Sequence, residues 1–237
     1  MIINDNKKVL LVTGSSRGIG RYIAEHYCTL DYTVIGCSRN GGTINHSNYH
    51  HICLDISLEK EIIDLVKCIR QKFKRLDVLV NNAAINPAIV SGALLPYATM
   101  EKIFKVNVFA PMLFCREAIK LMLRNKSGRI INIGSMAAKH EVAGEALYTS
   151  TKSALNSYTR VLAKEVIKMG ITVNVVAPAA IKTELSAQIN QAALAEVLSR
   201  NAIGQYGELS DVTNTLDFLI RTESNAITGQ IIYLGGA

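Results

Sequence analysis

The chain has 237 residues and a net charge of +7, and 49% of its residues are apolar while 19% are charged. This balance excludes an intrinsically disordered chain and suits one larger α/β domain with a full hydrophobic core. No apolar run approaches the roughly 18 residues that span a bilayer, and the polar N-terminus precedes a run too short for a signal peptide, so we expect a cytoplasmic protein with no membrane partner.

Charged and metal-binding residue types show no clustering. Lysines and arginines are spread along the chain without a basic run, so we interpret the positive charge as a solvated surface and expect no nucleic-acid partner; a phosphorylated cofactor or an acidic carrier would also suit it. The five cysteines form no C-x-x-C pair and the histidines lack ligand spacing, which predicts neither disulfides nor a metal site. His50 and His51 would point to opposite faces of a strand.

Seven apolar runs alternate with helical stretches along the chain. The runs cover residues 9–12, 33–37, 51–54, 76–80, 129–133, 171–176 and 230–234, and the helical stretches cover residues 21–30, 59–73, 100–120, 147–169 and 211–220. This alternation predicts an α/β fold: a single doubly wound (Rossmann) domain over residues 1–237, with a seven-stranded parallel sheet and helices on both faces. Only residues 38–48 join the second and third strands, and their Asn-Gly-Gly sequence favours a loop over a helix.

A glycine turn, residues 13–20, follows the first predicted strand and opens the first helix. Gly14 would permit a tight turn, Gly18 would let the backbone approach a ligand, and Gly20 would let the helix start pack against the strand. The N-terminus of the helix would then face a pyrophosphate. The spacing differs from the common Gly-x-Gly-x-x-Gly pattern, and glycine triplets also occur in plain turns, so this segment needs support from the rest of the chain.

Arg39 follows the second strand, about 20 residues beyond the glycine turn, where a dinucleotide-binding sheet reads the adenosine ribose. No acidic residue competes there, because Asp31 precedes the strand and Asp55 follows the third one. A guanidinium pairs well with a phosphate, so Arg39, helped by Arg17, favours NADP(H) over NAD(H). The alternative is a pair of solvated arginines.

The third and fourth strands are followed by further candidates. Asp55 and Ile56 suit an adenine amine and an apolar edge, although Asp55 could instead cap a helix that starts near Ser57. The small residues of Asn81-Asn82-Ala83-Ala84 would let the backbone approach a cofactor, and the asparagines can bind backbone groups of neighbouring turns.

Tyr148 and Lys152 lie four residues apart near the start of a predicted helix, which places both on one face. The tyrosine pKa is ordinarily near 10, and a nearby cation favours the phenolate that acid–base catalysis needs. The spacing occurs often by chance, and its alternative is an exposed helical pair. The ordered set of glycine turn, Asn82, Asn107, Ser135, Tyr148 and Lys152 argues for a site.

This ordered set resembles the short-chain dehydrogenase/reductase family, and the resemblance runs from residue 9 to residue 236. It implies that Ser135 holds the substrate oxygen, Tyr148 donates its proton, Lys152 binds the nicotinamide ribose and lowers the pKa of Tyr148, and Asn107 holds a water. The NADP(H)-binding residues that it implies are Gly14, Ser16, Arg17, Gly18, Ile19, Gly20, Arg39, Asp55, Ile56, Asn82, Ala83, Ala84, Tyr148, Lys152, Pro178, Ala179, Ile181 and Thr183.

Within the family, residues 128–131 and 170–178 are most similar to 3-oxoacyl-carrier-protein reductases. Ala84 and Ala179 replace glycines of the family pattern, Met169 stands where a basic residue is common, and the 38–48 connection is short. The resemblance implies NADPH-dependent reduction of a ketone, with a 3-oxoacyl thioester, which a carrier protein could present, or a small ketone as substrate. The alternatives are a sugar, sterol or secondary-metabolite alcohol as substrate, or a regulator without turnover.

Two further expectations concern assembly and substrate access. The resemblance implies a homotetramer, because residues 228–230 lead into the last strand as in tetrameric members. Residues 182–206 carry apolar side chains among polar ones, which is typical of a helical lid over a substrate and equally of an ordinary surface helix. Those apolar residues are Leu185, Ile189, Leu194, Val197 and Leu198.

Overall fold

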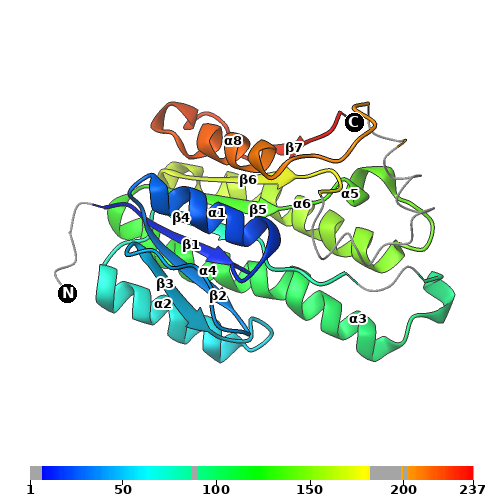
Figure 1. The fold of residues 1–237 in the computed structure, drawn as a ribbon, viewed down its shortest axis with the longest axis horizontal. Coiled ribbons are helices and arrows are strands. Elements are labelled where there is room, and N and C mark those ends of the chain that lie inside the picture. Colours follow the sequence, from blue (N-terminus) through cyan, green and yellow to red (C-terminus); the bar gives the residue numbers. More distant parts are fainter. Residues whose placement is uncertain (1–6, 87–89, 182–198, 200–201, 237) are drawn as a thin grey trace.

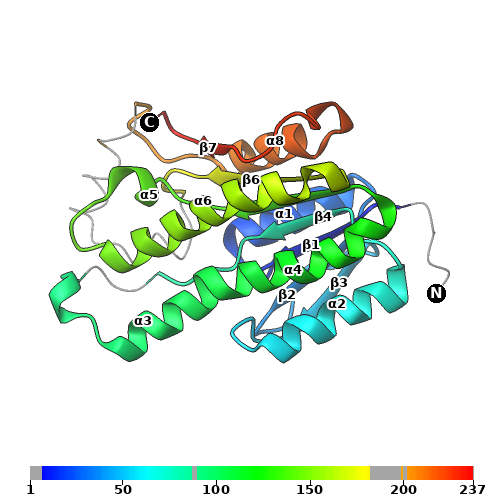
Figure 2. The same cartoon turned by 180° about the vertical axis from the view of Figure 1, so that it is seen from behind.

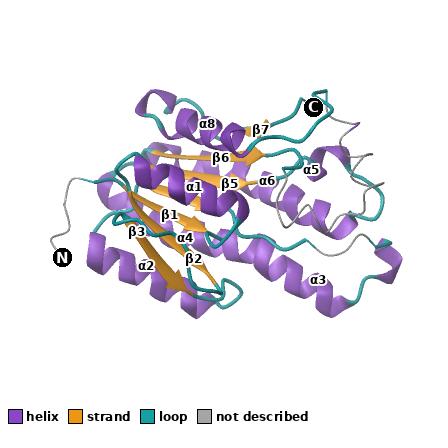
Figure 3. Ribbon diagram, viewed as in Figure 1, coloured by secondary structure: helices purple, strands orange, loops and turns teal. Residues whose placement is uncertain are grey.

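A computed structural model describes residues 7–86, 90–181, 199 and 202–236. Its centre is a seven-stranded sheet in the order β3-β2-β1-β4-β5-β6-β7, in which every neighbouring pair is parallel (Figure 3). The expected doubly wound α/β fold is therefore confirmed. The strands are β1 (Val9–Thr13), β2 (Thr33–Ser38), β3 (Tyr49–Cys53), β4 (Val78–Asn81), β5 (Gly128–Ile133), β6 (Ile171–Ala177) and β7 (Ile231–Tyr233).

Helices cover both faces of the sheet. One face carries α1 (Gly18–Thr29) and α8 (Leu209–Ile220), and the other carries α2 (Glu59–Phe73), α4 (Ala110–Met122) and α6 (Ala146–Val166), as the two opposite views show (Figures 1 and 2). Two shorter helices, α3 (Tyr97–Phe104) and α5 (Ala137–His140), lie near the carboxyl ends of the strands. None of the described helices is long and apolar enough to span a bilayer.

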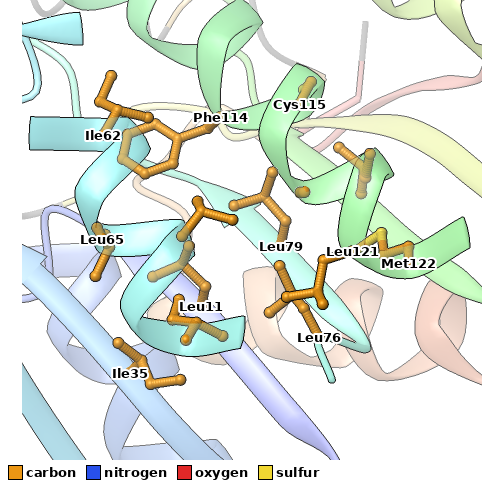
Figure 4. Packing of buried hydrophobic residues seen from close by; sticks show 14 of the residues in the cluster. Leu11, Ile35, Ile62, Leu65, Leu76, Leu79, Phe114, Cys115, Leu121 and Met122 are labelled. Carbon is orange, nitrogen blue, oxygen red and sulfur yellow. The ribbon is translucent and has the colours of Figure 1, made fainter. Parts of the chain in front are cut away.

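Strand periodicity divides the core between the two faces. Leu10 belongs to the cluster under α1 and α8, whereas its neighbour Leu11 belongs to the cluster under α2 and α4, because successive strand residues point to opposite sides. Figure 4 shows the second cluster, in which Phe114 of α4 packs near Ile62 of α2. With both faces buried, β1 is apolar at nearly every position, as the sequence suggested.

The predicted helix over residues 100–120 is wrong in detail. The chain instead forms α3, then a π-helical turn at Lys105–Phe109, then α4. Pro111 has no N–H to donate to the carbonyl of Asn107, so the regular α-helical pattern cannot run through this point. The N–H of Ala110 donates to the carbonyl of Lys105, five residues back.

Other boundaries shift by a few residues. The structure starts β3 at Tyr49, two residues before the predicted run, and ends α6 at Val166, followed by a 3-10 turn at Ile167–Met169. The short helix α5 was not predicted. The expected absence of a crossover helix between β2 and β3 is confirmed, since no helix occupies residues 39–48, all of which the structure describes.

Candidate active site

A cavity of about 430 Å³ opens at the carboxyl ends of the strands. It extends over the point where the strand order reverses between β1 and β4, which is where ligands bind in open parallel sheets. Most of the residues predicted for the site line it: Gly14, Ser16, Arg17, Gly18, Ile19, Arg39, Asp55, Ile56, Asn82, Ala83, Ala84, Ser135, Tyr148, Lys152, Pro178, Ala179 and Ile181.

Three predicted residues are not in that set. Gly20 and Asn107 lie outside the lining of the cavity. Thr183 falls outside the residues that the structure describes, as do residues 182–198, 200 and 201 of the predicted lid. Among the described residues, no group of three or more His, Cys, Asp or Glu side chains could hold a metal ion.

The glycine turn is held by the segment that follows β4. The side-chain amide of Asn82 donates to the carbonyls of Thr13 (2.9 Å) and Gly14 (3.3 Å). The hydroxyl of Thr13 accepts the N–H groups of Asn82 and Ala83, each at 3.0 Å. The prediction that an asparagine here binds the backbone of a neighbouring turn is thus confirmed for Asn82.

Gly20 packs against the turn itself more closely than against the strand. A Cβ at this position would lie 2.3 Å from both the Asn82 amide nitrogen and the Gly14 carbonyl oxygen, so no larger residue fits. The start of α1 therefore lies at the wall of the cavity. The first N–H groups of an α-helix have no hydrogen-bond partner inside the helix. A phosphate group fits this end of the cavity.

The end of the cavity beside β2 and β3 carries the cationic side chains of Arg39 and Lys102 and the carboxylate of Asp55. The Asp55 carboxylate accepts the N–H of Ser57 at 2.9 Å, and this bond, more than the charges of Arg39 and Lys102, holds the Asp55 pKa below its usual range. Helix α2 begins at Glu59 after Leu58, so Asp55 braces the turn before the helix and does not cap it. Arg39 is exposed and lines the rim of the cavity.

Ser135, Tyr148 and Lys152 come together at the opposite end of the cavity. Ser135 follows β5, accepts the N–H of Ala137 at 3.1 Å and is hydrogen-bonded to the Tyr148 hydroxyl. The Lys152 ammonium lies 5.7 Å from the centre of the Tyr148 ring and donates to the carbonyl of Ile133 at 2.8 Å. Tyr148 is 8% and Lys152 3% exposed, so the expected alternative of a solvated helical pair is excluded.

The electrostatics of this group differ from the expectation that Lys152 lowers the pKa of Tyr148. Burial raises the pKa of Tyr148 to about 12; the hydrogen bond from Ser135 opposes the rise, and the Glu145 carboxylate adds to it. Burial also lowers the pKa of Lys152 to about 8. Both ionised forms lose hydration in the protein, and this loss is the largest cause of each shift in pKa.

Asn107 supports the site from behind. Its side chain accepts the N–H of Ile85 at 2.9 Å and donates to the Ile85 carbonyl at 2.8 Å, and it also lies 3.3 Å from the hydroxyl of Thr151. The side chain is therefore committed to fixing the segment after β4. The role of Asn107 in holding a water stays a prediction.

The sequence reasoning missed three lining residues with charge or titratable groups: Lys102, His140 and Glu145. Glu145 is 8% exposed, and burial raises the pKa of its carboxyl group while His140 opposes the rise. Glu145 could have been found from its spacing to Tyr148. It precedes Tyr148 by three residues, and residues three apart at the start of a helix lie on the same face.

Comparisons with known proteins agree with this geometry. A family model described as short chain dehydrogenase matches residues 8–194. The chain is 34% identical over 239 residues to the 3-oxoacyl-(acyl-carrier-protein) reductase FabG of Buchnera aphidicola subsp. Baizongia pistaciae, covering 97% of this chain and 96% of the relative.

Two solved structures share the fold over almost their whole length. ElxO with NADP bound has a TM-score of 0.88 and 29% identity, over 96% of this chain and 97% of that one. A 3-ketoacyl-(acyl-carrier-protein) reductase from Brucella melitensis complexed with NADH has a TM-score of 0.89 and 25% identity, over 97% of each chain.

The electrostatics of Tyr148 can be tested directly. In Glu145→Gln we expect the pKa of Tyr148 to fall, because the substitution removes a negative charge that disfavours the phenolate. Ring-labelled tyrosine followed by NMR from pH 8 to pH 12 measures it, and Tyr148→Phe identifies the resonance. Glu141→Gln, an exposed change in the same loop, serves as the control. An unchanged or higher pKa in Glu145→Gln would show that the carboxylate does not act on Tyr148.

Proposed function

Because the chain belongs to the short-chain dehydrogenase/reductase family and is an oxidoreductase acting on CH–OH or C=O groups, we propose that it is an NADPH-dependent ketoreductase. The observation that carries the proposal is the buried group of Ser135, Tyr148 and Lys152 at one end of a cavity whose other end carries Arg39. The proposed substrate is the ketone of a 3-oxoacyl thioester, which a carrier protein would present, or a small ketone. The relatives named as 3-oxoacyl-(acyl-carrier-protein) reductases support this substrate class.

The bound nicotinamide would supply the two reducing electrons, in the form of a hydride, for the carbonyl carbon. Ser135 would donate a hydrogen bond to the carbonyl oxygen and hold it beside the Tyr148 hydroxyl, which gives its proton to that oxygen as negative charge develops. A phenol with its pKa raised to about 12 stays protonated at neutral pH, which is the form that the reductive step needs.

Lys152 would act on both the cofactor and the proton. Its ammonium faces the Tyr148 ring and would stabilise the phenolate that remains after proton transfer. The pKa of about 8 keeps the group mostly charged at neutral pH and close enough to release a proton to the phenolate. Donation to the Ile133 carbonyl fixes the ammonium at the end of β5, where it would also reach the nicotinamide ribose.

A second candidate is the reduction or oxidation of a hydroxylated substrate such as a sugar alcohol. Glu145 favours it, because a buried carboxylate on the cavity wall can accept a hydrogen bond from a substrate hydroxyl close to the reacting carbon. An apolar acyl chain gains nothing from that group. A panel of 3-oxoacyl thioesters and hydroxyketones assayed with NADPH would separate the two candidates by their kcat/KM ratio.

The proposed cofactor preference depends on Arg39. NADPH should bind at least about tenfold more tightly than NADH, as expected for one charge-assisted contact at an exposed site. Arg39→Ala should remove most of this preference, measured as the ratio of the two dissociation constants in fluorescence titrations. Arg124→Ala, an exposed arginine outside the cavity, should leave the ratio unchanged. Equal affinities in the wild type would refute the NADPH assignment.

The proposed acid–base role depends on the Tyr148 hydroxyl. Tyr148→Phe removes one oxygen, so NADPH affinity should change little while turnover falls by about 10²–10⁴-fold. Tyr158→Phe lies ten residues further along the same helix, outside the cavity, and is the matched control. Steady-state turnover with NADPH and a ketone measures both. Activity of Tyr148→Phe within a few fold of the wild type would remove the catalytic assignment.

We also propose a homotetramer that pairs α4 and α6 between subunits. Figure 2 shows these helices side by side on one outer face, and they leave large apolar side chains in solvent: Phe109, just before α4, is 51% exposed and Val161 of α6 is 54% exposed. Light scattering at micromolar concentration should give four times the mass of one chain. Val161→Asp should lower that mass, whereas Leu30→Asp, at the end of α1, should not. A monomer with full activity would count against the proposal.

A further inference from the structure

A chain of hydrogen bonds runs across the sheet from the glycine turn to the segment that carries Arg39. The hydroxyls of Ser15 and Tyr49 lie 2.9 Å apart, the Tyr49 hydroxyl lies 2.7 Å from Nδ1 of His51, and Nε2 of His51 lies 2.8 Å from the carbonyl oxygen of Asn40. Its members come from three separate parts of the chain: the end of β1, the strand β3 and the loop after β2. We call Ser15, Tyr49 and His51 the polar relay.

The polar relay has a defined direction when His51 is neutral. The Asn40 carbonyl can only accept, so Nε2 of His51 carries the hydrogen and Nδ1 is left as an acceptor. Tyr49 therefore donates to Nδ1, and its oxygen accepts from the hydroxyl of Ser15. Ser38 also donates to the Asn40 carbonyl, at 2.6 Å. Two donors thus hold the carbonyl of Asn40, the residue after Arg39.

Two glycines, Gly36 and Gly42, leave the space that the side chains of the polar relay occupy. A Cβ on Gly36 of β2 would lie 2.2 Å from the Tyr49 hydroxyl and 2.3 Å from Oγ of Ser15. A Cβ on Gly42 would lie 2.4 Å from Nδ1 of His51. Any side chain at either position would push a relay member aside, so the two glycines create the space in which these bonds form.

The polar relay lies where the fold omits a helix. Tyr49 packs on the cluster under α1, while His50 points to the opposite face and lies 5.4 Å from the ring of Phe73 in α2. The connection over residues 39–48 has no helix, so no apolar helical stripe anchors it to this face, and its apolar contact with the cluster is through Ile44, beyond the turn of residues 38–40. Hydrogen bonds from the polar relay anchor the first residues of the connection.

We propose that Ser15, Tyr49 and His51 are positioning residues that hold the turn of residues 38–40 so that Arg39 meets the 2′-phosphate of the cofactor. This inference rests on the proposed NADP(H) preference and deepens it. The Arg39 side chain is exposed and long, and a fixed backbone reduces the number of conformations that it gives up on binding. The same bonds tie the phosphate-reading turn to Ser15, inside the glycine turn, so the two ends of the adenosine site keep one spacing.

Nucleotide fragments test the proposal without turnover. Adenosine 2′,5′-bisphosphate carries the 2′-phosphate and ADP does not, and isothermal titration calorimetry gives a dissociation constant for each. In Tyr49→Phe and His51→Phe we expect binding of the bisphosphate to weaken by about three- to tenfold, the loss of one or two neutral hydrogen bonds. Binding of ADP should change by less than about twofold.

Control variants separate positioning from general damage. His51→Gln keeps a donor near Nε2 and should recover most of the bisphosphate affinity. His50→Gln changes the neighbouring histidine on the other face and should have no effect. Thermal unfolding of each variant checks the fold, and Tyr49→Phe, which loses a single oxygen, provides the test if His51→Phe does not fold.

A double-mutant cycle with Arg39→Ala completes the test. If the polar relay acts through Arg39, adding Tyr49→Phe to Arg39→Ala should cause no further loss of bisphosphate affinity. A full additional loss, or an equal loss for ADP, would overturn the inference. If Arg39→Ala abolishes the preference for the bisphosphate and the relay variants do not, the inference fails while the proposed function stands. Equal binding of both fragments to the wild type would overturn the NADP(H) preference and the inference together.

Discussion

The two hydrogen bonds from the Asn82 amide to the carbonyls of Thr13 and Gly14 are the interaction on which the site depends. They join the ends of β1 and β4, the two parallel strands between which the strand order of the sheet reverses. Gly20 packs onto both partners at a distance that admits no side chain. The start of α1, the glycine turn and the end of β4 therefore form one closely packed unit, and this unit forms one wall of the cavity.

The opposite end of the cavity is governed by desolvation. The surrounding protein removes water from both Tyr148 and Lys152, which raises the pKa of the phenol and lowers that of the ammonium. The two pKa values therefore move apart, to about 12 for Tyr148 and about 8 for Lys152, and the phenol stays protonated at neutral pH. The hydrogen bond from Ser135 lowers the pKa of Tyr148, whereas the Glu145 carboxylate raises it. Two neighbouring side chains thus tune the proton affinity of one phenol.

The backbone behind the site is shaped by a proline and by a missing helix. Pro111 interrupts the helical pattern after Asn107, and the wider turn lets that side chain reach the Ile85 backbone. Near β3, the connection after β2 contains no crossover helix; Ile44 packs on the apolar cluster under α1 and α8, and His51 of β3 hydrogen-bonds to the first residues of the connection. In both places a polar side chain fixes the backbone of a residue that lines the cavity, Ile85 in the first and Asn40 in the second.

The sequence alone determined the features that depend on local spacing. The seven strands, the helices between them and the shared face of Tyr148 and Lys152 follow from periods of two and 3.6 residues. The lining residues that directly follow the first five strands could be predicted because parallel strands end at one edge, whereas Pro178, Ala179 and Ile181 came from the family resemblance. Three features were decided only by the tertiary structure. They are the burial that raises the pKa of Tyr148 where a lowered pKa was expected, the position of Glu145 near Tyr148, and the hydrogen bond between Ser15 and Tyr49. These depend on water excluded by distant segments and on contacts between residues far apart in the chain, and neither leaves a periodic signal in the sequence.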